Sequence, residues 1–220
     1  MEDDRGASNT AELAVLLRAH CMVRRRKEEV HDQLAQLQLP LPVKHRHKVE
    51  LVVASGQEME ERREEAEREG QEAGPQEVQQ GKKLLQWFAA SALAKLPAVQ
   101  GHLRGVLAED RKCLVFCHHR AMVAGVVDLL EEQDVGFVKI DGGVGSEERA
   151  RLVQRFQTDH SCMVAVLSLK AANTGLTLTE AELVVFAELF WNPGDLLQAE
   201  DRAHRIGQTR AVTCQYLVAR

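Results

Sequence analysis

The 220-residue chain is predicted to be an α/β protein, built on a parallel sheet with helices on both faces. Short, almost wholly apolar runs at residues 113–117, 163–167 and 183–186 alternate with longer segments of helical periodicity. Strands that are apolar at nearly every position are typical of a parallel sheet that is buried on both sides. Hydrophobic residues make up 45% of the chain, which is enough to form a substantial core.

Composition excludes several classes of protein. The formal net charge is -5, so the chain is not a polybasic DNA-coating protein, and contacts with phosphates must be local. Aromatic residues make up only 4%, which argues against a stacking platform for single-stranded nucleic acid. The five cysteines are odd in number and form no C-x-x-C pair, so neither a disulfide framework nor a zinc knuckle is indicated.

The sequence shows neither the pattern of a signal peptide nor that of a membrane span. The N-terminal residues MEDDRGASNT are acidic and polar, unlike a signal peptide. No apolar run reaches the roughly 20 residues that a membrane span requires. We therefore expect a soluble, intracellular protein without a membrane partner.

The first part of the chain divides into three segments. Residues 11–30 have helical periodicity and carry a basic run, and after Pro40 and Pro42 the β-branched residues 49–53 predict a strand. Residues 56–80 are rich in Glu and Arg and nearly lack apolar residues, so they form either a solvated helix or, as we favour, a flexible insert. A helix is then expected up to Pro97.

Alternating strands and helices follow. A helix over residues 120–133 and a strand over 137–140 come after the strand at 113–117. Ser146 is a candidate N-cap for the next helix, with Glu147 and Glu148 in its first turn, where the positive helix end favours carboxylates. The last strand is expected over 214–218.

Ligands of parallel α/β sheets bind where loops leave the carboxyl ends of the strands. In this sequence that rule indicates four places, which are His118-His119, Asp141-Gly142, Ser168-Leu169-Lys170 and the loop after Phe186. A metal site at the two histidines is a poor interpretation, because no further ligands lie at suitable spacing.

A helix near the C-terminus has a clear start signal. Asn192 is a candidate N-cap, Pro193 suits the first helical position, and Asp195 stands where a capping box favours a carboxylate. The apolar side of this helix is expected to dock on the sheet through Ala199, Ala203 and Ile206.

The polar side of the same helix carries the chemistry. Gln198, Arg202 and Arg205 are spaced i, i+4, i+7 and are expected to share one face. Two guanidinium groups held close together suit a triphosphate, whose charge must be stabilised during phosphoryl transfer. The alternative is that both arginines pair with Glu200, Asp201 or other carboxylates on a solvated helix.

Several segments resemble the motifs of the Swi/Snf-related helicase superfamily. QAEDRAHRIGQ at 198–208 resembles motif VI, LVFCHH at 114–119 resembles motif IV, and LSLKAANTGLTL at 167–178 resembles motif V. IDGGVGSEER at 140–149 and the Trp191-Asn192-Pro193 triplet stand where this family has similar segments. The resemblance is strongest to the annealing-helicase subgroup, which includes HepA-related protein.

This resemblance implies a RecA-like C-terminal helicase lobe over residues 82–220. A charged flexible insert would occupy 56–81, and the end of a first lobe with the inter-lobe junction would occupy 1–55. Arg202 and Arg205 would be arginine fingers that reach ATP on the other lobe, with Gln198, Gly175 and Asp201 lining the ATP cleft. Glycine suits position 175, since the backbone there needs close approach or a positive φ.

The DNA contacts implied are His118, Gly142, Ser168, Lys170, Thr177 and Trp191. For Trp191 a buried core role is equally favoured.

The implied activity is that of a DNA-dependent ATPase, an annealing helicase acting on forked or bubble DNA in replication-fork repair in the nucleus. No Walker loop and no Asp-Glu-x-His box occurs in the chain, so ATP and Mg²⁺ would be held mainly by a first lobe and the isolated chain would be inactive. Its partners would be that lobe, duplex, fork or junction DNA, and a single-strand-binding protein. The alternatives are a truncated, inactive lobe that binds DNA or protein, and an unrelated nucleotide-binding regulator.

Overall fold

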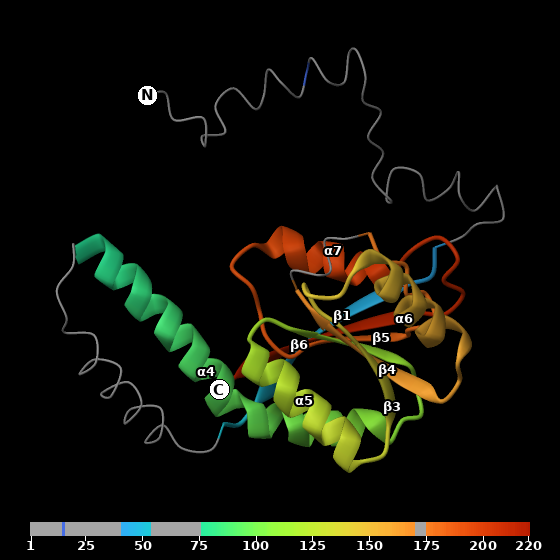
Figure 1. Cartoon of the computed structure of the whole chain (residues 1–220), viewed down its shortest axis with the longest axis horizontal. Coiled ribbons are helices and arrows are strands. Elements are labelled where there is room, and N and C mark those ends of the chain that lie inside the picture. Colours follow the sequence, from blue (N-terminus) through green and yellow to red (C-terminus); the bar gives the residue numbers. More distant parts are fainter. Residues whose placement is uncertain (1–14, 16–40, 54–75, 170–174) are drawn as a thin grey trace. The chain divides into compact units, whose positions relative to one another are not determined.

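The structure, a computed structural model, describes residues 15, 41–53, 76–169 and 175–220 (Figure 1). The predicted helix at 11–30, Lys170 and most of the predicted insert lie outside these residues. The unit from Pro42 to Arg220 contains ten helices and strands in the described ranges. They are β1 (Lys44–Leu51), α4 (Gln76–Leu107), β2 (Cys113–Cys117), α5 (Arg120–Glu132), β3 (Gly136–Ile140), α6 (Ser146–Thr158), β4 (Cys162–Ser168), β5 (Leu183–Phe186), α7 (Pro193–Ala203) and β6 (Val212–Ala219).

The six strands form one sheet in the order β1-β6-β5-β2-β4-β3, and all five pairings are parallel. Every residue of β2 and β5 is buried, which explains why these central strands are apolar at each position. β1 lies at the edge and exposes most of its polar residues. The predicted parallel α/β sheet is confirmed.

Helices cover both faces of the sheet (Figure 1). Along β2, Phe116 packs into one core with Phe156 of α6 and Ala199 of α7, whereas Val115 packs into the other with residues of α4 and α5. This division follows from the strand geometry, because successive side chains point to opposite faces. The four described helices therefore form two layers, α6 and α7 on one side and α4 and α5 on the other.

Helix α4 is longer than predicted. The prediction that a helix ends at Pro97 is wrong, since α4 continues through Pro97 to Leu107. Proline removes one backbone donor, but Val99, Leu103 and Val106 beyond it are all buried against the sheet, and their burial stabilises the continued helix. α4 also begins at Gln76, inside the range expected for the insert, and β1 belongs to the sheet although it falls within the expected junction.

The predicted N-cap of α7 is correct, whereas the predicted N-cap of α6 is wrong. Asn192 caps α7 as predicted, since its Oδ1 accepts a hydrogen bond from the Gly194 backbone N–H at 3.0 Å, and Pro193 follows at the first position. Ser146 is not the N-cap of α6; Gly145 is, and Ser146 is the first helical residue. Glu147 and Glu148 do lie in the first turn.

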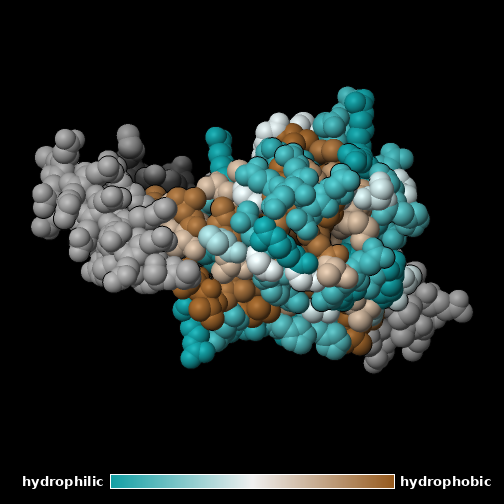
Figure 2. All heavy atoms as spheres, turned by 90° about the horizontal axis from the view of Figure 1, so that it is seen from below, coloured by the Kyte–Doolittle hydropathy of each residue, from teal (hydrophilic) through white to brown (hydrophobic). Residues whose placement is uncertain are grey.

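The surface is mostly hydrophilic on the face shown in Figure 2, where apolar patches interrupt it. Leu85, Trp87 and Leu93 of α4 are large apolar residues that remain exposed. Among the described residues, no helix is long and apolar enough to cross a membrane. The four described cysteines are buried, free thiols that pack as small hydrophobes in the core.

Candidate functional site

The two candidate arginines lie at the end of α7. Arg202 is in its last turn, but α7 ends at Ala203, so Arg205 lies beyond the helix. The prediction that Gln198, Arg202 and Arg205 share one helical face is therefore wrong for Arg205. His204 leaves the helical conformation, with φ -86° and ψ 78°, and its Nε2 lies 2.8 Å from the Pro42 carbonyl oxygen.

Helix termination also changes the apolar side of the segment. Ala199 and Ala203 are buried against the sheet, as predicted. Ile206 was expected to dock beside them, but it is 52% exposed because the chain has already turned away. Gly207 completes this turn with φ +101°, a conformation that favours glycine.

Both arginines nevertheless converge on one loop. The Arg205 Nη1 donates to the Gly175 carbonyl oxygen at 3.4 Å and to the Thr177 Oγ1 at 3.1 Å. The Arg202 Nη1 lies 3.5 Å from the Leu176 carbonyl oxygen, and the Leu178 N–H donates to the Arg202 carbonyl oxygen at 2.9 Å. Residues 198–208 and 175–178, which resemble motifs VI and V, are thus in direct contact.

Gly175 has the conformation expected of it. Its φ is +74°, in the left-handed region, and a Cβ built there would meet no atom within 4 Å. Glycine is favoured at this position by backbone conformation, since space is not limiting. In this conformation the Gly175 carbonyl oxygen accepts the hydrogen bond from the Arg205 guanidinium.

The arginines have unusual electrostatic surroundings. Within the described ranges neither guanidinium has a carboxylate partner, and the Arg202 Nε is buried without a hydrogen bond. Burial, followed by the neighbouring charge of Arg205, lowers the pKa of Arg202. The nearby charge of Asp201 opposes this shift. Two cations whose hydrogen bonds in the described ranges go to carbonyl and hydroxyl oxygens are suited to an anionic ligand such as a phosphate.

The acidic residues between the arginines bind other partners. Glu200 is fully buried and accepts hydrogen bonds from Arg46 and Lys44 of β1 and from the Tyr216 hydroxyl of β6. Asp201 lies 3.5 Å from the Lys44 Nζ. The alternative in which the arginines pair with Glu200 is therefore wrong, whereas the charge of Asp201 does act on neighbouring Arg202.

A second group of candidate residues lies at the carboxyl edge of the sheet. Because β5 and β6 are parallel, α7 runs back from this edge, and its last turn lies toward the opposite edge. His118 follows β2, Gly142 lies in the exposed turn after β3, and Ser168 ends β4. The Gly143 N–H donates to the Asp141 Oδ1 at 2.9 Å, which shapes that turn. Gln198 is exposed on α7, one turn before Arg202.

At the same edge the structure reveals a residue that the sequence analysis missed. Glu188, only 3% exposed, accepts hydrogen bonds from the His118 N–H at 2.7 Å and the His119 N–H at 2.9 Å. Its Oε1 also lies 2.5 Å from the His119 Nδ1. Glu188 thereby binds the backbone between β2 and α5 and joins the ends of β5 and β2. Its signal was a carboxylate two residues after an apolar strand.

Aromatic side chains gather around these histidines. The Phe88 ring lies 4.7 Å from the rings of His119 and Trp191, and Phe190 lies 4.9 Å from His118, measured between ring centroids. Trp191 is 54% exposed, so the alternative that it is a core aromatic is wrong. Although aromatic residues are scarce in the composition, the fold brings several of them together beside an exposed indole.

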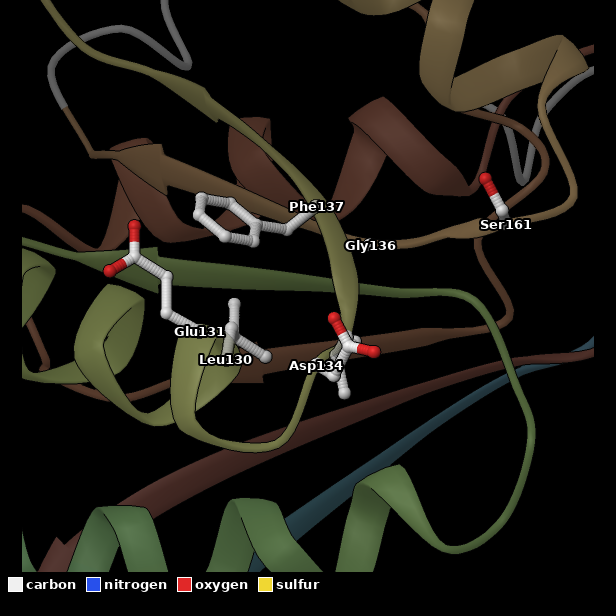
Figure 3. Close-up of a pocket in the computed structure, with 7 residues that line it drawn as sticks. Leu130, Glu131, Asp134, Gly136, Phe137 and Ser161 are labelled. Carbon is white, nitrogen blue, oxygen red and sulfur yellow. The ribbon is translucent and has the colours of Figure 1, made fainter.

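The pocket shown in Figure 3 has unsuitable chemistry for a nucleotide. Its volume is about 460 Å³, and it lies where α5 ends and β3 begins, opposite the carboxyl edge. Glu131 and Asp134 line it together with Phe137 and Ser161, and no Lys or Arg does so. Two carboxylates would repel a phosphate. No cluster of three or more metal-ligating side chains exists among the residues that the structure describes.

Comparison with known families decides the classification. The sequence pattern of the helicase conserved C-terminal domain family matches residues 94–207. The chain belongs to this family. Over 220 residues it is 42% identical to the SWI/SNF-related matrix-associated actin-dependent regulator of chromatin subfamily A-like protein 1 of Drosophila melanogaster, covering 99% of this chain and 28% of the relative. It is also 42% identical to the human DNA annealing helicase and endonuclease ZRANB3, covering 99% of this chain and 20% of that relative.

Solved structures give the same classification of the fold. The C-terminal part of the Fun30 ATPase domain matches with a TM-score of 0.66 at 17% identity, covering 82% of this chain and 86% of that one. The Sulfolobus solfataricus SWI2/SNF2 ATPase core in complex with dsDNA matches with a TM-score of 0.64 at 22% identity, covering 95% of this chain and 47% of that one. The Swi/Snf resemblance and the RecA-like helicase C-terminal fold are confirmed. The chain spans about a quarter of the length of the Drosophila and human relatives described above.

Proposed function

We propose that this chain is the second lobe of an ATP-dependent DNA translocase of the annealing-helicase type, and that Arg202 and Arg205 are its arginine fingers. The observation that carries the proposal is the pair of guanidinium groups that form no ion pair with a carboxylate in the described part of the chain and are held against the loop that begins at Gly175. Family membership supports the coarser part, namely a helicase lobe.

The proposed catalytic role of the lobe is electrostatic. ATP and Mg²⁺, held mainly by a first lobe, supply the phosphoryl group and the metal charge. Arg202 and Arg205 stabilise the negative charge that builds up on the transferred group, while Gln198 and Asp201 line the same cleft. Where an arginine forms no ion pair with a carboxylate, no such pair has to break before the guanidinium binds a phosphate.

The proposed DNA contacts are made by a separate set of residues. They are His118, Gly142, Ser168, Lys170, Thr177 and Trp191, most of which follow the carboxyl ends of strands. Contacts of this type are made to the DNA backbone and position the strand without reading its sequence. Thr177 belongs to both sets, because its hydroxyl also accepts from Arg205, and it links DNA binding to the nucleotide. The substrates are forked or bubble DNA in replication-fork repair in the nucleus, where a single-strand-binding protein is a further partner.

A chimeric protein tests this function. Residues 1–220 replace the matching segment of the human annealing helicase, which is 42% identical, and DNA-stimulated ATP hydrolysis and strand annealing are measured. We expect the chimera to be active and Arg205→Ala to lower turnover by ~10³-fold or more, with DNA affinity largely retained. The matched control is Arg151→Ala, since Arg151 is an exposed arginine that pairs with Glu147 on α6.

Three outcomes would count against the proposal. Unchanged turnover of Arg205→Ala in an active chimera would remove the arginine from the mechanism. DNA-stimulated turnover by residues 1–220 in isolation would contradict the need for a first lobe. A chimera that binds DNA but never hydrolyses ATP would favour the alternative, an inactive lobe that serves as a DNA- or protein-binding module.

A further inference from the structure

Edge strand β1 makes a dense set of contacts with the end of α7. The Arg46 Nε and Nη2 donate to the two carboxylate oxygens of Glu200 at 2.6 and 2.7 Å. The Lys44 Nζ donates to the same carboxylate at 2.7 Å and lies 3.5 Å from Asp201. One turn further along the chain, the His204 Nε2 lies 2.8 Å from the carbonyl oxygen of Pro42, just before β1.

The centre of this network is a buried, ionised carboxylate. Glu200 has no exposed surface, and burial would raise its pKa, but the hydrogen bonds from Arg46, Lys44 and Tyr216 lower that pKa to about 2. The bidentate geometry with Arg46 fixes the orientation of the carboxylate as well as its position. A buried ion pair of this kind adds little net stability compared with apolar packing, and its best-supported use is to specify one arrangement.

The contacted residues alternate with the two candidate arginine fingers. Glu200 and Asp201 directly precede Arg202, and His204 directly precedes Arg205. β1 and Pro42 just before it therefore contact Glu200, Asp201 and His204, whereas the neighbouring Arg202 and Arg205 contact the Gly175 loop. β1 also occupies the carboxylates nearest in sequence to Arg202 and Arg205, which would otherwise compete with an anionic ligand for the guanidinium groups.

We propose that Lys44 and Arg46 are positioning residues that hold Glu200 and Asp201 and thereby orient Arg202 and Arg205 toward the nucleotide. This inference rests on the proposed function for its consequence in catalysis, but not for its structural content. Because the Pro42 carbonyl contacts His204, a displacement of the chain where it enters β1 also displaces the C-cap of α7.

The structural content is tested by hydrogen exchange in the 220-residue chain, comparing Arg46→Ala with the unaltered protein. Backbone amides of residues 199–208 should exchange ~10-fold faster, while those of β2 and β5 are unchanged. Arg46→Lys keeps the positive charge but loses the bidentate geometry, and it should have a smaller effect. The matched control is Lys48→Ala on the same strand, since Lys48 pairs with exposed Glu50 at 2.9 Å and does not contact α7. Unchanged exchange at 199–208 in Arg46→Ala would overturn the proposal.

The consequence for catalysis is tested in the chimeric protein described above by a double-mutant cycle. Arg46→Ala should lower kcat on the order of 10²-fold, since small displacements of a catalytic group have effects of this size, while DNA affinity is retained. In an Arg205→Ala background it should have little further effect, because Arg46 acts through the arginines. A full additional loss in that background would overturn the positioning role. If Arg205→Ala itself had no effect, the proposed function would fail, whereas the exchange result would stand separately.

Discussion

The two sides of the last turn of α7 differ in how their charges are satisfied. On one side, Glu200 is fully buried and receives hydrogen bonds from Arg46, Lys44 and Tyr216. On the other, Arg202 and Arg205 contact only carbonyl and hydroxyl oxygens of the Gly175–Leu178 loop among the described residues. The same eleven-residue motif therefore contains a saturated charge and two charges that remain available for a ligand.

Glu200 therefore has a structural role, whereas Arg202 and Arg205 in the same segment have the proposed role of binding a ligand. A buried charge with several ionic partners fixes the chain, and removing one partner leaves the others uncompensated. A half-buried arginine without a carboxylate partner has no such role in stability, because burial disfavours its charge and lowers its pKa. A partly buried charge without an ion-pair partner is typical of functional sites, where a side chain serves binding and not stability.

The largest effect on stability is expected from Glu200→Gln in residues 1–220. The pKa of Glu200 is lowered to about 2 in the folded protein, so its ionised form stabilises the fold at neutral pH. The variant should therefore have a free energy of unfolding lower by about 3 kcal/mol at pH 7. Urea denaturation monitored by circular dichroism measures it.

The pH dependence of this difference has a definite sign. The folded pKa lies below the ordinary value of 4.5, so the stabilisation is complete above about pH 4.5 and is lost as the pH falls toward 2. The unaltered protein and Glu200→Gln should converge in stability over that range. Glu147→Gln is the control, since Glu147 is exposed on α6. A difference that persisted at pH 2 would show that Glu200 does not act through its charge.

Much of the fold could be predicted from the sequence. The strands at 113–117 and 183–186 were predicted with the bounds that the structure has, because central strands of a parallel sheet are apolar throughout and flanked by polar turns. The start of α7 was also predictable, since Asn192 and Pro193 together form a local capping signal. These features depend on residues that are close in sequence.

Features that depend on distant contacts were not predictable. The end of α7 at Ala203 depends on Pro42, more than 150 residues away, whose carbonyl binds His204. The buried role of Glu200 depends on Lys44 and Arg46 of β1, whereas the strand was predicted only from residue 49 because residues 44–48 are all polar. Glu188 was missed because two of its three partners are the backbone N–H groups of His118 and His119, which any residue type would offer.

A smaller effect is expected at the loop that receives the arginines. Gly175→Ala forces an alanine into a left-handed conformation with φ +74°, while the added Cβ meets no atom within 4 Å. The free energy of unfolding should fall by about 1 kcal/mol, the cost of that backbone conformation for a residue with a Cβ. Gly105→Ala is the matched control, because it lies in α4 with equally open space and should be stabilising. Equal effects of the two would mean that the Gly175 backbone is free to change its φ.

The smallest effect on stability is expected for Arg205→Ala, the substitution with the largest expected effect on turnover. Arg205 is exposed and loses only two hydrogen bonds, to the Gly175 carbonyl and the Thr177 hydroxyl, both of which water can replace. The free energy of unfolding of residues 1–220 should change by less than about 0.5 kcal/mol, as is usual for a surface substitution. A loss of about 2 kcal/mol or more would identify Arg205 as a structural tie between α7 and the Gly175 loop, comparable with Glu200. With stability unchanged, a loss of turnover in the chimera can be attributed to the guanidinium group, because the lobe that carries it is still folded.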